Sequence, residues 1–75
     1  MKQIQIKVKN DENFTATSLM WRYAKENNLQ FCYTDYRNYL FIDGEYYSYD
    51  HWEITPCEDA PEYDTVTLYL MKKEN

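Results

Sequence analysis

The sequence predicts an α+β fold of the order β-α-β-β-β, with one helix packed on a four- to five-stranded, mainly antiparallel sheet. Apolar and polar residues alternate near both ends of the chain, and apolar residues recur at helical spacing after residue 15. The pair Asp43-Gly44, between two strand-like segments, is typical of a two-residue hairpin turn. The length of 75 residues is that of one domain, so residues 1-75 are expected to fold together.

Five segments have the pattern of strands. Residues 3–9 and residues 65–71 alternate most cleanly, so they are expected to lie side by side at the centre of the sheet. The remaining segments are residues 29–34, 39–42 and 45–54. Between the last two strands, residues 55–64 contain two prolines and are expected to form a loop.

One helix is expected in the first half of the chain. Thr15 or Thr17 is the expected N-cap, because a threonine hydroxyl accepts a hydrogen bond from a free backbone N–H of the first turn. The helix is expected to end at Asn27-Asn28, since asparagine tolerates the left-handed conformation of a C-cap. The apolar face that should pack in the core contains Ala16, Leu19, Met20, Tyr23 and Ala24.

The Asp43-Gly44 turn also predicts a pairing register. A two-residue turn places Ile42 opposite Glu45 and Tyr39 opposite Ser48. If the following strand is regular, two sets of side chains alternate between the two faces of the sheet. One set is Phe41, Tyr46, Trp52 and Ile54, and the other is Leu40, Tyr47, Tyr49 and His51.

Charge is segregated along the chain. The protein has 13 acidic and 8 basic residues, a net charge of −5, yet residues 43–64 contain eight carboxylates and no Lys or Arg. Like charges gathered on a small domain repel one another and destabilise the compact state. We therefore expect this segment to contact a basic partner, since carboxylates steer a cationic surface and aromatic rings anchor interfaces. The expected partner-binding residues are Asp43, Glu45, Tyr47, Tyr49, Asp50, Trp52, Glu53, Glu58, Asp59, Glu62 and Asp64.

The chain resembles small phage-encoded inhibitors of restriction or CRISPR nucleases in its size, its acidity and its high content of Asn, Lys, Tyr and Ile, which have AT-rich codons. Proteins of that class act as nucleic-acid mimics, in which carboxylates stand in for phosphates. The resemblance implies a non-enzymatic inhibitor whose acidic, Tyr-rich half, residues 43–64, blocks the basic nucleic-acid-binding surface of a partner enzyme such as a nuclease.

An alternative is a small structural or assembly protein that self-associates through exposed aromatic residues, while the acidic face only keeps it soluble. A homodimer is a related possibility, because basic residues in the first half of the chain would pair with the acidic half of a second copy. These basic residues are Lys2, Lys7, Lys9, Arg22, Lys25 and Arg37. No nucleic-acid-binding motif accompanies them, so direct binding to nucleic acid is not expected.

The sequence does not favour an enzyme. The only such hypothesis is a nucleophilic pair of His51 and Cys57, which are six residues apart. No metal or other cofactor is expected, because the acidic loop lacks the spacing of a zinc or calcium site. Without an apolar signal segment or membrane span, the expected location is the cytoplasm, that of the host if the gene is carried by a phage. Cys32 and Cys57 are expected to be reduced there.

Overall fold

In the computed structural model, which describes residues 1–74, the chain forms one helix and five strands. They are β1 Lys2–Lys9, α1 Ala16–Asn27, β2 Gln30–Thr34, β3 Arg37–Ile42, β4 Glu45–Pro56 and β5 Tyr63–Lys72. The predicted α+β class is confirmed, and the five strands correspond to the five segments that have the strand pattern. β4 and β5 are longer than predicted, so the connection between them shortens to residues 57–62.

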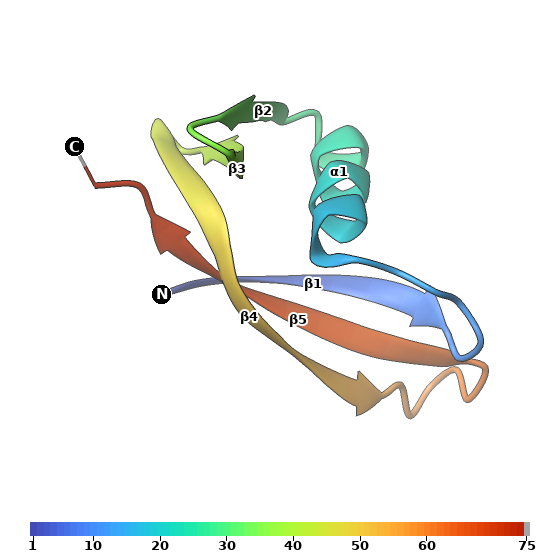
Figure 1. The fold of residues 1–75 in the computed structure, drawn as a ribbon. Helices are drawn as coiled ribbons and strands as arrows, with labels where there is room; N and C mark the ends of the chain where they lie inside the picture. Colours follow the sequence, from blue (N-terminus) through green and yellow to red (C-terminus); the bar gives the residue numbers. More distant parts are fainter. Residues whose placement is uncertain (75) are drawn as a thin grey trace.

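The strands form one antiparallel sheet in the order β1-β5-β4-β3-β2 (Figure 1). The first and last strands are neighbours, as predicted, but the prediction that both are central is wrong for β1, which lies at an edge. β5 pairs with β1 on one side and with β4 on the other. Within residues 1–74, no strand pairs with the other side of β1, after which the chain enters the helix.

The helix begins and ends at the predicted signals. The side chain of Thr15 accepts a hydrogen bond from the N–H of Ser18, and the Ser18 hydroxyl oxygen accepts one from the N–H of Thr15. This reciprocal capping box satisfies two backbone donors that a helix leaves free. At the other end, Asn28 has φ 58° and is the left-handed C-cap.

The core lies between α1 and one face of the sheet. Leu19, Met20 and Ala24 are buried on the inner side of the helix. They pack against the alternating apolar residues of the strands, because every second side chain of a strand points to the same face. The strand residues of this core are Ile4, Ile6, Val8, Leu40, Ile42, Val66, Leu68 and Leu70.

The hairpin between β3 and β4 has the predicted turn and register. Asp43 and Gly44 have φ of 51° and 82°, the positive values that a type I′ turn requires at both central positions. Ile42 lies opposite Glu45, and Tyr39 lies opposite Ser48.

A β-bulge at Asp50 makes the predicted division of side chains wrong beyond this residue. Tyr49 pairs with Leu70 and His51 with Tyr69, so Asp50 is an extra residue in β4. One added residue moves all later side chains to the opposite face. Trp52 and Ile54, opposite Leu68 and Val66, therefore share the helix-facing side with Leu40, Tyr47 and Tyr49, whereas His51 joins Phe41 and Tyr46 on the other side.

Candidate protein-binding surface

The second half of β4 is an open edge of the sheet. β3 pairs with β4 only from Glu45 to Ser48, whereas β5 pairs with β4 as far as Pro56. Residues 49–56 thus have β5 on one side and no other strand of the described chain on the other. Figure 1 shows this half of β4 running beyond the β2–β3 hairpin beside β5, in a molecule that measures 41 × 21 × 20 Å.

β3 separates from β4 next to the bulge. Their pairing ends at Tyr39 and Ser48, although β3 extends back to Arg37. A bulge bends its strand and increases the local twist. The extra residue Asp50 therefore accounts for the divergence of the two strands and for the edge that is left open.

The backbone groups of Trp52 and Ile54 point away from β5. The N–H of Cys57 donates to the carbonyl of Tyr63, with an N···O distance of 3.3 Å, so Cys57 directs its polar groups toward β5. In antiparallel strands this direction alternates from residue to residue. The odd-numbered residues among 51–55 therefore bond to β5, and the N–H and C=O groups of Trp52 and Ile54 face the unpaired side.

Three apolar side chains line the helix-facing side of this edge. Tyr49, Trp52 and Ile54 have 37%, 40% and 47% of their surface exposed. Phe14, from the connection between β1 and α1, packs edge-on against Trp52 with ring centroids 5.2 Å apart. Large exposed apolar groups are typical of interaction sites when they are contiguous. These three residues and Phe14 are therefore candidate interface anchors.

The opposite side of the same edge is polar. The His51 ring stacks on Tyr69 at 4.4 Å, and its Nδ1 lies 2.6 Å from a carboxylate oxygen of Asp50. The Tyr69 hydroxyl donates a hydrogen bond of 3.0 Å to the Glu53 carboxylate. This bond, together with partial desolvation, raises the pKa of Tyr69 above its usual value. Hence Asp50 and Glu53 are held in place beside the open edge.

Six of the eight predicted carboxylates fall into two groups at opposite ends of β4, and the other two, Asp50 and Glu53, lie between them. Asp43 lies 3.6 Å from the ammonium of Lys2, and Glu45 lies 3.3 Å from that of Lys72. The negative charge is therefore neutralised locally at the end of the molecule that contains the β3–β4 turn, here called the hairpin end. At the other end, four carboxylates of the loop and of the start of β5 have no ion pair in the described part of the chain. These are Glu58, Asp59, Glu62 and Asp64.

The predicted partner-binding residues therefore do not form one compact face. The 12 residues of β4 span about 40 Å at the usual rise of an extended strand. Tyr47 lies in the hairpin half, half-buried against the core, with the Lys2 ammonium 5.6 Å from its ring centroid. Apart from Asp43, Glu45 and Tyr47, the predicted residues lie within residues 49–64, here called the acidic arm, which comprises the open half of β4, the loop and the start of β5.

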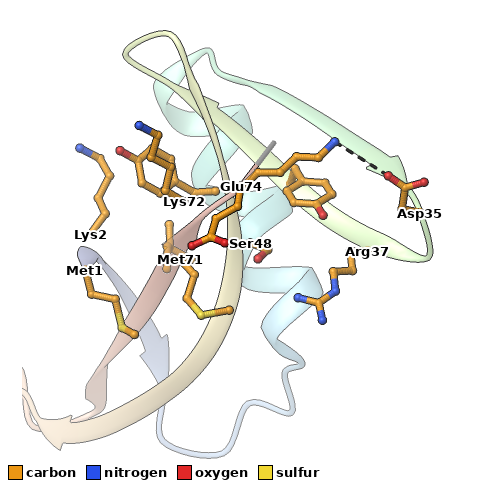
Figure 2. A pocket seen from close by; sticks show the side chains of 12 residues that line it. Met1, Lys2, Asp35, Arg37, Ser48, Met71, Lys72 and Glu74 are labelled. Atoms are coloured by element: carbon orange, nitrogen blue, oxygen red, sulfur yellow. Dashed lines mark ion pairs between the residues drawn. The ribbon is translucent and has the colours of Figure 1, made fainter.

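Basic residues gather at the hairpin end of the molecule. Lys2, Arg37, Lys72 and Lys73 line an open hollow of about 1480 Å³ (Figure 2). The Lys73 ammonium lies 3.9 Å from the Asp35 carboxylate, an ion pair drawn as a dashed line in Figure 2. The lysines of the C-terminal segment were not among the predicted basic residues, because only the pairing of β5 with β1 and β4 brings them beside Lys2.

The other predicted basic residues are distributed over the molecule. Lys7 and Lys9 lie on β1, where Lys7 sits 5.9 Å from the ring centroid of Tyr63. Arg22 forms an ion pair with Glu12, and the hydrogen bond from this guanidinium lowers the pKa of Glu12. Lys25 is 5.4 Å from the ring centroid of Trp21. A single basic patch of the six predicted residues does not form.

The pair of His51 and Cys57 does not have the geometry of a nucleophile and its base. Six residues of extended strand separate them by about 20 Å, far beyond hydrogen-bond reach. In the described part of the chain, no three side chains among His, Cys, Asp and Glu lie close enough together to hold a metal ion. Cys32 and Cys57 are half-buried free thiols.

Phe14 and Ile54 belong to this surface but were not predicted as part of it. Ile54, like Trp52, was placed on the face opposite to that of Tyr49, since nothing in the alternation of β4 revealed the bulge. The one available signal was Asp50 itself, because aspartate is uncommon in the interior of strands. No local signal places Phe14 beside Trp52, which is 38 residues away in the chain.

No protein-family model matches the chain, and no curated protein or solved structure is significantly similar to it. Within residues 1–74, no helix is long and apolar enough to cross a membrane.

Proposed function

We propose that the protein is a non-enzymatic inhibitor that binds another protein through the acidic arm, residues 49–64. The arm would occupy a basic, nucleic-acid-binding surface of a partner enzyme, as small phage-type anti-restriction and anti-CRISPR mimics do. The cytoplasm, where such enzymes handle nucleic acid, is the proposed place of action.

One observation carries this proposal: on the arm, exposed apolar anchors adjoin carboxylates that form no ion pair within the described residues. Trp52 and Ile54 are 40% and 47% exposed, and the loop beyond them contains Glu58, Asp59 and Glu62. Unpaired carboxylates attract a cationic partner over several ångströms and speed its association. Partly buried rings and aliphatic groups supply the desolvated contacts that hold it.

Asp43 and Glu45 have a smaller part in this proposal than the loop carboxylates. Their neighbours Lys2 and Lys72 reduce the negative potential at the hairpin end. A basic partner would therefore gain more from the loop end of the arm, where Glu58, Asp59 and Glu62 form no ion pair within the described residues. This difference allows the acidic arm to be tested separately from the overall acidity of the protein.

The test is a pull-down from the lysate of a low-GC bacterium, with washes at low and then at high salt. We expect the immobilised protein to retain a nucleic-acid-handling enzyme, to release it in high salt and to inhibit its activity when both are purified. The double variant Glu58→Lys with Asp59→Lys should lose both binding and inhibition.

The matched control changes the net charge equally at another place. Glu26 on α1 and Glu74 near the C-terminus are exposed, so Glu26→Lys with Glu74→Lys preserves the arm. This control should bind and inhibit like the original protein. Equal retention of the enzyme by the arm variant and the control would contradict the proposal.

The exposure of Tyr49, Trp52 and Ile54 also favours a second candidate, in which these residues join copies of the same chain. This self-association would appear as a mass that rises with protein concentration in analytical ultracentrifugation. Trp52→Ala should then restore the monomer, whereas a monomer at all concentrations would exclude this candidate.

A further inference from the structure

We infer that the partner adds an extended strand to the open edge of β4, and that this strand is basic on one side and apolar on the other. The inference rests on the proposed function, because it specifies how the acidic arm holds its partner. It also specifies the chemistry of the segment that is bound, which alternates Lys or Arg with apolar residues.

The backbone of β4 supplies the first reason. Trp52 and Ile54 direct their N–H and C=O groups to the side on which β4 has no partner strand among residues 1–74. Such an edge is a ready template for a strand from another chain, with main-chain hydrogen bonds giving affinity. Pairing with β3 stops at Ser48, and Pro56, which has no N–H, occupies the last outward position. The open interval is long enough for a strand of about five to seven residues.

The side chains of β4 determine which strand fits. Residues directly opposite each other in adjacent strands share a face of the sheet. Residues of the added strand opposite Trp52 and Ile54 would contact these apolar groups on the helix-facing side. Their alternate neighbours would lie on the side of Glu53 and beside Asp50, where Lys or Arg forms ion pairs. The complementary strand therefore alternates apolar and basic residues.

The two other edges of the sheet do not fit such a strand. The N–H of Asn10 donates to the Glu62 carbonyl, with an N···O distance of 3.0 Å, so the even-numbered residues of β1 bond to β5 and the odd-numbered residues point outward. Lys7 and Lys9 are among these outward residues and would repel a basic strand. The other edge strand, β2, has only five residues and carries no carboxylate.

The charge of β4 argues against a second copy of the chain as the occupant. Two β4 edges paired with each other would bring Asp50 and Glu53 of both copies close together, and like charges facing each other across strands are destabilising. A basic strand from a different protein has no such penalty.

A synthetic octapeptide of four Lys-Val repeats with blocked ends is the probe. Its control, four Lys-Pro repeats, has the same charge but lacks the backbone N–H groups on every second residue. We expect the Lys-Val peptide to bind the full chain at least about tenfold more tightly, since several backbone hydrogen bonds depend on those groups. In amide hydrogen exchange, Trp52 and Ile54 should become protected by the Lys-Val peptide only.

A pair of variants tests the edge from the protein side. Ile54→Pro removes an outward N–H and no hydrogen bond to β5, while Ile54→Ala removes the same side chain and keeps the N–H. The Lys-Val peptide should bind Ile54→Pro about three- to tenfold more weakly than Ile54→Ala, the effect of one lost hydrogen bond. If Ile54→Pro does not fold, the comparison of the two peptides on the original chain decides the question alone.

Equal binding of the two peptides, or binding that leaves the Trp52 and Ile54 amides unprotected, would overturn strand addition. So would the absence of binding by the Lys-Val peptide. The proposed function is judged separately by the pull-down with Glu58→Lys and Asp59→Lys. If that variant loses the enzyme while both peptides bind alike, the arm binds a basic partner by side-chain contacts and not by a shared sheet.

Discussion

Replacing Gly44 by alanine should destabilise the protein by about 1 kcal/mol through backbone strain alone. Gly44 has φ 82°, and a Cβ built at this position meets no atom within 4 Å, so no steric clash with the rest of the fold contributes. An L-residue in the left-handed region costs about 1–2 kcal/mol. Alanine also restricts the unfolded chain, which offsets about 0.4–1 kcal/mol of this cost.

The assay is urea unfolding at equilibrium, followed by tryptophan fluorescence, together with thermal unfolding. A loss of about 1 kcal/mol lowers the Tm of a domain of this size by about 4–8 °C. Gly44→Asn is the matched control, and its loss should be smaller because asparagine tolerates positive φ. If Gly44→Ala is as stable as the original protein, the turn does not require positive φ and the derivation of the β3–β4 register from it is refuted.

Two further predictions concern the core and the alkaline limb of stability. Leu68→Ala, at a position with no exposed surface, should cost about 2–5 kcal/mol in urea unfolding, whereas Tyr36→Ala, at a position 92% exposed, should change stability by less than about 0.5 kcal/mol. Because Glu53 raises the pKa of Tyr69 in the folded state above its unfolded value near 10.0, the stability from this bond is complete below pH 10 and is lost as the pH rises further. Urea unfolding from pH 8 to 11.5 measures the stability difference between the original protein and Tyr69→Phe. This difference should be constant below pH 10 and fall above it. A constant difference throughout would contradict the Tyr69–Glu53 bond.

The distribution of charge gives the molecule two different ends. At the hairpin end, Lys2 and Lys72 neutralise carboxylates. They also help to line a hollow in which most of the charged residues are basic. At the loop end, Glu58 and Asp59 form no ion pair within the described residues. A count over residues 43–64 treats all eight carboxylates as one feature. In the folded protein these carboxylates differ, because ion pairing depends on distances of a few ångströms and only some of them have a lysine that close.

The candidate surface could be predicted from the sequence only in part. The exposed Tyr49 and Trp52 and the carboxylates near them are residues whose types favour interfaces, and they lie together on the acidic arm. The open backbone edge could not be predicted, since it depends on where β3 leaves β4. Trp52 and Ile54 were predicted on the face opposite to that of Tyr49, because the bulge at Asp50 changes the alternation without changing the composition of the strand.

What the sequence alone determined are the features governed by neighbours along the chain. The Thr15 cap, the Asn28 stop, the Asp43-Gly44 turn with its register and the alternation of β1 and β5 all depend on contacts within a few residues. Tertiary structure decided the position of β1 at the edge, the bulge at Asp50, the pairing of Lys72 with Glu45 and the open half of β4. These features depend on which distant strands share hydrogen bonds, and many strand orders are compatible with the same local pattern, so only the packing of the whole chain selects one.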